Sequence, residues 1–191
     1  MSGTAEVHTT ATLSPSKLEL LAEWLPKQAW FNGDPADLER VAFWRFVDPD
    51  GEVGIDSMLI RSGEAIYHVP VTWRAEPLDE GDLIGTLEHS ELGTRYGYDA
   101  VSDPVYVVEL GRVIREGDTE SDITPAGRPD EVLPKTIRIE GSGVVAEAYL
   151  AGQLRLVREL GNEDTRAARG LLIGHWNHAG SDREDILAVL R

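Results

Sequence analysis

The sequence predicts an α+β fold, in which a helix packs on an antiparallel sheet and a second β-rich subdomain follows. An amphipathic segment near the N-terminus precedes three apolar runs that are separated by short turns. A polar stretch containing Gly and Pro then interrupts this pattern, and short alternating segments come after it. In a chain of 191 residues these features indicate two small subdomains. We place them at residues 14–115 and 135–191, with a linker over 116–134.

Composition narrows the class of protein. The chain has 34 acidic and 18 basic residues and a net charge of −16, which argues against nucleic-acid and membrane partners. It contains no cysteine, so disulfides and thiolate metal sites are excluded. No basic region followed by an apolar run marks a secretory signal, and no apolar stretch approaches the ~20 residues of a membrane span. We therefore expect a cytoplasmic protein without a cofactor.

The first predicted element is a helix after residues 1–13, which are small and polar and are expected to be frayed. Ser16 and Glu19 have the spacing of a capping box, and Pro26 ends the helical pattern. The apolar positions of the helix fall on one face: Leu18, Leu21, Ala22 and Leu25. This segment should lie on a sheet.

Three antiparallel strands are predicted next, over residues 41–47, 53–61 and 65–73. The turn between the first two reads Asp-Pro-Asp-Gly over 48–51, where Pro presets φ and Gly accepts a positive φ. Pro70 lies within the third strand and lacks an amide donor, so we expect this strand at an edge of the sheet or with a bulge there.

A second helix is predicted over 104–115, after a long polar excursion at 76–100 with only short strand candidates. Asp103 suits the N-cap and Pro104 the first helical position. The run VYVVEL is rich in β-branched residues and could alternatively form a strand. Residues 116–134 contain little apolar sequence and are predicted to be an exposed linker.

The second subdomain should be antiparallel sheet. Its strand candidates alternate apolar and polar residues and cover 136–140, 144–150, 153–159 and 171–176. The last stretch, 185–191, is ambiguous, because Ser181 and Glu184 form a capping-box pattern that would favour a helix.

The order of several segments resembles the N-terminal cap of actinobacterial maltokinases and stand-alone proteins related to that cap. The segments are LLAEWLPKQAWF (20–31), the strand pair around 41–60, IYHVPVTWRAEP (66–77) and YDAVSDPVY (98–106). The resemblance covers roughly residues 15–115, and it is looser from 136 onwards. It implies a cystatin-like arrangement of helix on sheet, helix for 104–115 and a final strand over 185–191.

The resemblance also implies a function in trehalose, maltose or α-glucan metabolism. The sequence has no H-x-D followed by a nearby Asn and no D-F-G, which a kinase of this superfamily would need. Gly141-Ser142-Gly143 near Lys135 is better explained as a turn than as a phosphate loop. We therefore expect a non-catalytic binding or regulatory module, which would associate with an enzyme of this metabolism or with itself.

Candidate ligand-binding or partner-binding groups cluster between the third strand and the second helix. They are Trp73, His89, Arg95, Tyr96, Tyr98, Asp99 and Asp103. Imidazole, guanidinium, phenol and carboxylate groups can bind a small molecule or a partner. Alternatively they form a self-satisfied network, with Arg95 paired to Asp99 or Asp103. A different class of function also stays open, namely an enzyme with an unrecognised site around His89 and Arg95, or a phosphotransferase remnant.

Two further patterns have a functional and a structural explanation. His175 and His178 have an H-x-x-H spacing that could hold a metal, but positions three apart face opposite sides of a strand, so no metal site is predicted. Trp73 could stack on a sugar or fill the core. Together with Trp30 and Phe31 it could also form an exposed apolar surface for a partner, unless the second subdomain covers it.

Overall fold

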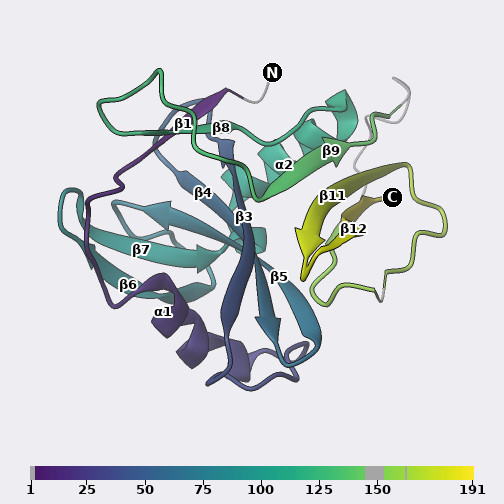
Figure 1. Cartoon of the computed structure of the whole chain (residues 1–191), viewed down its shortest axis with the longest axis horizontal. Helices are drawn as coiled ribbons and strands as arrows, with labels where there is room; N and C mark the ends of the chain where they lie inside the picture. The colour runs from purple at the N-terminus through teal and green to yellow at the C-terminus, as the bar shows by residue number, and fades with distance from the viewer. Residues whose placement is uncertain (1–2, 145–152, 162) are drawn as a thin grey trace.

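The computed structural model describes residues 3–144, 153–161 and 163–191, and it has the predicted α+β class. A six-stranded antiparallel sheet has the strand order β2-β6-β7-β5-β4-β3, and α1 lies against it (Figure 1). Its strands are β2 (Leu13–Ser14), β3 (Glu39–Val47), β4 (Gly54–Ser62), β5 (Ala65–Arg74), β6 (Leu83–His89) and β7 (Gly93–Asp99).

The first helix, α1 (Lys17–Trp24), covers one face of this sheet. The predicted capping box is present, because the Ser16 side chain accepts from the Glu19 amide and the Glu19 side chain accepts from the Ser16 amide. A short 3-10 turn, η1 (Leu25–Lys27), follows the helix. The apolar face of α1 is buried in a cluster with side chains of β4 and β5. The helix-on-sheet arrangement is therefore as predicted.

The opposite face of the sheet packs against α2 (Pro104–Glu116) and a second sheet. This second sheet is antiparallel, with the order β10-β12-β11-β9. Its strands are β9 (Ile137–Gly141), β10 (Leu154–Leu156), β11 (Gly170–His178) and β12 (Ser181–Leu190). One hydrophobic core contains Trp44 of the first sheet, Leu110 of α2 and Leu187 of the second sheet. Among the described residues no helix is long and apolar enough to cross a membrane.

Helix α2 begins as the Asp-Pro signal predicted, after the short 3-10 turn η2 (Ala100–Ser102). Asp103 is the N-cap, and its Oδ1 accepts from the Val105 amide at 3.0 Å. The same carboxylate is 0% exposed and accepts two hydrogen bonds from Arg74, at 2.7 and 2.8 Å. The end of β5 and the start of α2 are thus joined through one side chain.

We expect Asp103→Ala to lower the free energy of unfolding by about 3 kcal/mol. Loss of the cap accounts for about 1 kcal/mol, and loss of a charge-assisted pair accounts for about 2 kcal/mol more. Asp103→Asn keeps a capping oxygen but not the charge, so it should cost less than alanine. Urea unfolding monitored by circular dichroism measures both variants. An alanine variant with an unchanged midpoint would contradict this account of the helix start.

Two segments are more ordered than the sequence predicted. Strand β1 (Thr4–Val7) pairs in parallel with β8 (Asp122–Pro125), so these four residues of the predicted frayed segment are ordered. The predicted linker at 116–134 is not exposed throughout, because Glu120 is 3% exposed and its carboxylate accepts from the Ile139 amide at 2.6 Å. The sequence has few apolar residues in either segment, and composition alone did not reveal the pairing of β1 with β8 or the contact of Glu120 with the Ile139 amide. The subdomain boundaries themselves stay a prediction.

The polar excursion and the third strand also differ from expectation. Residues 76–100 contain the hairpin β6–β7, which adds to one side of β5. Strand β5 is therefore an inner strand, but β7 pairs only with its last four residues, Val71–Arg74. Beside the preceding residues of β5 lies a segment of the second subdomain, where the His68 amide donates to Arg158 O at 2.8 Å. Pro70 lies just before the β5–β7 pairing begins, which explains why a proline is tolerated there.

The C-terminus is a strand. Strand β12 pairs with β11 along its length and buries Leu187 and Val189, so the helical alternative for 185–191 is wrong. Pairing with neighbouring strands and burial of the side chains from Leu187 to Leu190 override the local capping pattern. Of the strand predicted at 144–150, residues 145–150 lie outside the described part of the chain.

Candidate functional site

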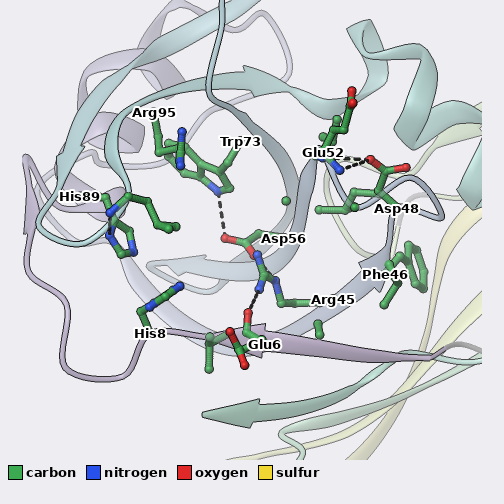
Figure 2. A pocket seen from close by; sticks show the side chains of 18 of the residues that line it. Glu6, His8, Arg45, Phe46, Asp48, Glu52, Asp56, Trp73, His89 and Arg95 are labelled. Atoms are coloured by element: carbon green, nitrogen blue, oxygen red, sulfur yellow. Dashed lines mark hydrogen bonds and ion pairs between the residues drawn. The ribbon is translucent and has the colours of Figure 1, made fainter. Parts of the chain in front are cut away.

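A cavity of about 540 Å³ lies between the N-terminal segment and the α1-side face of the six-stranded sheet. We call it the sheet cavity. Residues 4–8 form one wall, and β3, β4 and the end of β5 contribute another. Figure 2 shows Asp56 in the middle, with His89 and Arg95 on one side of it and Asp48 and Glu52 on the other. Its volume is in the range of small-molecule sites.

Main-chain contacts fix the N-terminal segment over the sheet. Arg45 of β3 donates from Nη1 to the carbonyl oxygen of Glu6 at 2.9 Å. Farther along, the amide of Ser90 donates to Thr12 O at 3.0 Å, and the amide of Thr12 donates to Ser90 Oγ at 3.0 Å. The pairing of β1 with β8 holds the start of the segment. These residues therefore form a wall of the cavity.

Asp56 is a fully buried carboxylate between cations. Arg45 Nε lies 2.7 Å from Oδ1, Lys17 Nζ is ion-paired with Oδ2, and Trp73 Nε1 donates to Oδ2 at 2.9 Å. Burial by itself would raise the pKa of Asp56, but the charges of Lys17 and Arg45, with the hydrogen bonds, hold it at about 2. Asp56 is thus ionised at neutral pH and links α1, β3 and β5.

His89 is held as one tautomer by the turn that follows it. Its Nδ1 lies 3.2 Å from the amides of both Glu91 and Leu92 and accepts from them, so in the neutral ring Nε2 carries the proton. Burial lowers the pKa of His89, and the nearby positive charges of His8, Arg95 and Lys17 lower it further against the opposing charge of Glu91. His89 therefore offers a neutral N–H donor at neutral pH.

His8 approaches His89 from the N-terminal segment. The two ring centroids are 5.4 Å apart in an edge-to-face arrangement. His8 Nδ1 lies 2.7 Å from Glu91 Oε2, and Thr10 Oγ1 donates to the other oxygen of Glu91 at 3.1 Å. Residues far apart in the chain thus meet at this end of the cavity.

Of the candidate residues predicted from the sequence, three line the sheet cavity and four lie outside it. Trp73, His89 and Arg95 line the sheet cavity. Tyr98 and Asp103 have structural partners elsewhere: Tyr98 Oη accepts from the Leu78 amide at 2.8 Å, and Asp103 binds Arg74. The other two candidates, Tyr96 and Asp99, are also absent from the residues that line this cavity. Alternation along β7 separates the predicted cluster, because Arg95 and the tyrosines point to opposite faces.

The predicted pairing of Arg95 with Asp99 or Asp103 is wrong. Asp99 is ion-paired with Arg158, and Asp103 is paired with Arg74. Arg95 donates only to its neighbour's carbonyl oxygen, Thr94 O, at 3.3 Å among the interactions of the described residues. Arg158 and Arg74 are distant from these aspartates in sequence, so spacing alone did not identify them as the partners.

The predicted exposed aromatic surface is absent. Phe31 and Trp73 are each 8% exposed, and Trp73 is further enclosed by Gly97, where a Cβ would lie 2.6 Å from the indole. Trp30 is half-buried, and Arg158 of the second subdomain lies over its ring at 4.7 Å. Trp73 is thus not an exposed sugar platform, and Arg158 partly covers Trp30.

Sequence reasoning missed the central residues of the cavity: His8, Lys17, Arg45 and Asp56. One signal was available, because Asp56 interrupts the apolar run of a predicted strand and an ionised carboxylate is rarely buried without partners. Elsewhere, no group of three His, Asp or Glu side chains within the described ranges is arranged to hold a metal ion.

The fold and the cavity define an α+β module in which a helix covers one face of a sheet and a polar ligand-sized space lies beside that helix. Residues 24–103 match the family described as the maltokinase N-terminal cap domain. The resemblance inferred from the sequence is therefore confirmed over this segment, which runs from the end of α1 to the N-cap of α2. The match is to the cap and not to a catalytic kinase domain. No solved structure matches the chain.

Proposed function

We propose that this chain is a non-catalytic, cap-like module of trehalose, maltose or α-glucan metabolism, and that it binds a small molecule in the sheet cavity. The carrying observation is that seven polar side chains of the cavity lie within the segment that matches the cap family. They are Arg45, Asp48, Glu52, Asp56, Trp73, His89 and Arg95. The proposal includes a cytoplasmic location and association with an enzyme of that metabolism or with a second copy of this chain.

The chemistry of the cavity suits binding better than proton transfer. A general base should have a pKa near the working pH. Asp56 has a pKa of about 2, accepts hydrogen bonds from Lys17 and Trp73, and is ion-paired with Arg45. His89 uses Nδ1 to accept two amides, so it has no free lone pair with which to take a proton. These groups can still donate hydrogen bonds and fix the orientation of a ligand.

An enzyme with its site around His89 and Arg95 is the second candidate. The observation in its favour is that these two side chains do line the same ligand-sized cavity. The two functions differ in their response to nucleotide. A thermal shift with Mg-ATP would support a phosphotransferase remnant, and the absence of a shift would support the module.

We predict that the chain transfers no phosphate. The physical reason is the lack of a catalytic Asp with a following Asn and of a metal-binding Asp motif in the sequence. Incubation with ATP, Mg²⁺ and maltose, glucose or glucosamine should yield no sugar phosphate above a heat-inactivated control. Reproducible turnover that disappears when one of the chain's own carboxylates is changed, in a variant that stays folded, would show that the chain is an enzyme.

A further inference from the structure

One end of the sheet cavity gathers basic side chains. We call it the cationic end and define it by His8, Lys17, His89 and Arg95, which come from the N-terminal segment, α1, the end of β6 and β7. The mutual proximity of these groups is independent of the cavity outline, because His8, Arg95 and Lys17 all act electrostatically on His89. A cluster of basic side chains is unexpected in a chain with a net charge of −16. Such a cluster attracts anions, which suggests an anionic ligand.

Within the described part of the chain, Glu91 pairs with His8 and Asp56 pairs with Lys17, and other donors at this end have no carboxylate partner. Among the described residues, Arg95 has no carboxylate partner, and its recorded hydrogen bond is to Thr94 O. Lys17 has three N–H donors and uses one on Asp56. The Nε2 proton of His89 is the one ring donor that its turn leaves to other partners. Asp56 is shared between Lys17, Arg45 and Trp73, and no contact within the described ranges joins it to Arg95.

We propose that the cationic end binds the phosphate group of a phosphorylated small molecule. A phosphate group presents three terminal oxygens in a tetrahedral arrangement, and it can accept donors that arrive from several elements at once. A planar guanidinium can take two of these oxygens, while an ammonium and an imidazole N–H take the third. A carboxylate has two oxygens in one plane and matches such converging donors less well.

The remainder of the cavity has room for the rest of such a molecule. On the other side of Asp56 the lining includes Asp48 and Glu52 and the strand residues around them (Figure 2). Asp48 is largely engaged, since it accepts from the amides of Glu52 and Val53 at 3.0 and 2.9 Å. The exposed Glu52 carboxylate is an acceptor suited to hydroxyl groups. A phosphorylated sugar has this combination of an anionic end and a hydroxylated body.

His8 and Lys17 lie outside the residues that match the cap family. The cationic end is therefore completed by the N-terminal segment and the first turn of α1. Our inference deepens the proposed function, because it names the ligand class of the same cavity. A neutral sugar that binds without preference for a phosphate would leave the proposed function intact and remove this inference.

The test is calorimetric titration of the full chain with glucose 1-phosphate, glucose, glucuronate and inorganic phosphate, at one ionic strength. We expect glucose 1-phosphate to bind and inorganic phosphate to compete with it, with glucose and glucuronate weaker. Arg95→Gln should raise the dissociation constant for glucose 1-phosphate by about tenfold, as loss of a charged hydrogen bond predicts. Arg95→Lys keeps the charge but loses the two-pronged guanidinium. Its dissociation constant for glucose 1-phosphate should lie between those of the wild-type chain and Arg95→Gln.

Arg138→Gln is the matched control, because it removes the same charge from β9, where the side chain is 62% exposed and paired with Glu140. It should change the dissociation constant by less than about twofold. Thermal unfolding of each variant checks that the fold is retained. The inference is overturned if glucose 1-phosphate does not bind, if glucuronate or glucose binds as tightly, or if Arg95→Gln and Arg138→Gln behave alike.

Discussion

Asp56→Asn is expected to lower the free energy of unfolding by about 3–5 kcal/mol, as for removal of one partner from a buried ion pair. The side chain of Asp56 is 0% exposed, and it neutralises Lys17 and Arg45, whose side chains are 26% and 15% exposed. Asparagine has nearly the same shape and can still accept from Trp73, so packing is preserved. The decrease in the free energy of unfolding therefore measures the contribution of the Asp56 charge. Urea unfolding followed by tryptophan fluorescence measures it.

The effect should depend on pH in a defined direction. Because interactions with Lys17 and Arg45 hold the pKa of folded Asp56 at about 2, below its ordinary value of 3.8, the carboxylate contributes stability above that ordinary value. This contribution is lost as the pH falls through the folded pKa. The difference between the wild-type chain and Asp56→Asn should accordingly shrink by roughly 2 kcal/mol between pH 4 and pH 2.

Glu131→Gln is the control for this prediction. Glu131 is also paired with an arginine, Arg128 at 2.6 Å, but the two side chains are 50% and 56% exposed. An exposed pair is worth less than about 1 kcal/mol, so this variant should unfold close to the wild-type midpoint. An Asp56→Asn protein as stable as Glu131→Gln would mean that the buried cluster contributes little to the fold.

Arg158→Met is expected to destabilise the chain by about 3 kcal/mol or more. Arg158 follows β10 of the second sheet, and its guanidinium is ion-paired with Asp99 of β7 and lies 4.7 Å from the centre of the Trp30 ring. Its backbone oxygen also accepts from the His68 amide of β5 at 2.8 Å. Methionine preserves the apolar part of the side chain, so the main loss is the charge that faces Asp99.

The double variant Arg158→Met/Asp99→Asn tests this explanation. Asp99 is 4% exposed, and burial raises its pKa while Arg158 opposes the rise. Without Arg158 the carboxylate would be buried and unpaired, whereas asparagine carries no charge to leave unpaired. The double variant should therefore be more stable than Arg158→Met alone, and the two substitutions should not be additive. Additive losses would indicate that Arg158 acts through Trp30 or through packing.

Arg166→Met is the control for the removal of an arginine. The Arg166 side chain is 90% exposed, and its recorded ion pair is with Asp164 at 2.9 Å. This substitution should change the free energy of unfolding by less than about 1 kcal/mol. A comparable loss in Arg166→Met and Arg158→Met would point to a general effect of net charge in this acidic chain.

The elements with strong local signals were determined by the sequence. The capping box at Ser16 and Glu19, the Asp-Pro start of α2 and the strand pair β3–β4 all lie where the sequence predicted them. These signals depend on residues close together in the chain, which decide caps, turns and which face of an element is apolar. The resemblance to the maltokinase cap was likewise visible in the order of short segments, and the family match confirms it for residues 24–103.

Only the tertiary structure decided the partners of the charged residues. Asp99 pairs with Arg158, and His8 meets His89, although each pair is separated by more than fifty positions. A sequence shows which carboxylates need a partner, but many cations are available and spacing does not select one. The sheet cavity depends on long-range contacts of the same kind, because pairing with β8 and the hydrogen bond from Arg45 hold the N-terminal segment across the sheet. The candidate site therefore depends on two features of the fold. Strand alternation places Arg95 and its neighbouring tyrosines on opposite faces, and the N-terminal segment and α1 place His8 and Lys17 at the same end of the cavity as Arg95.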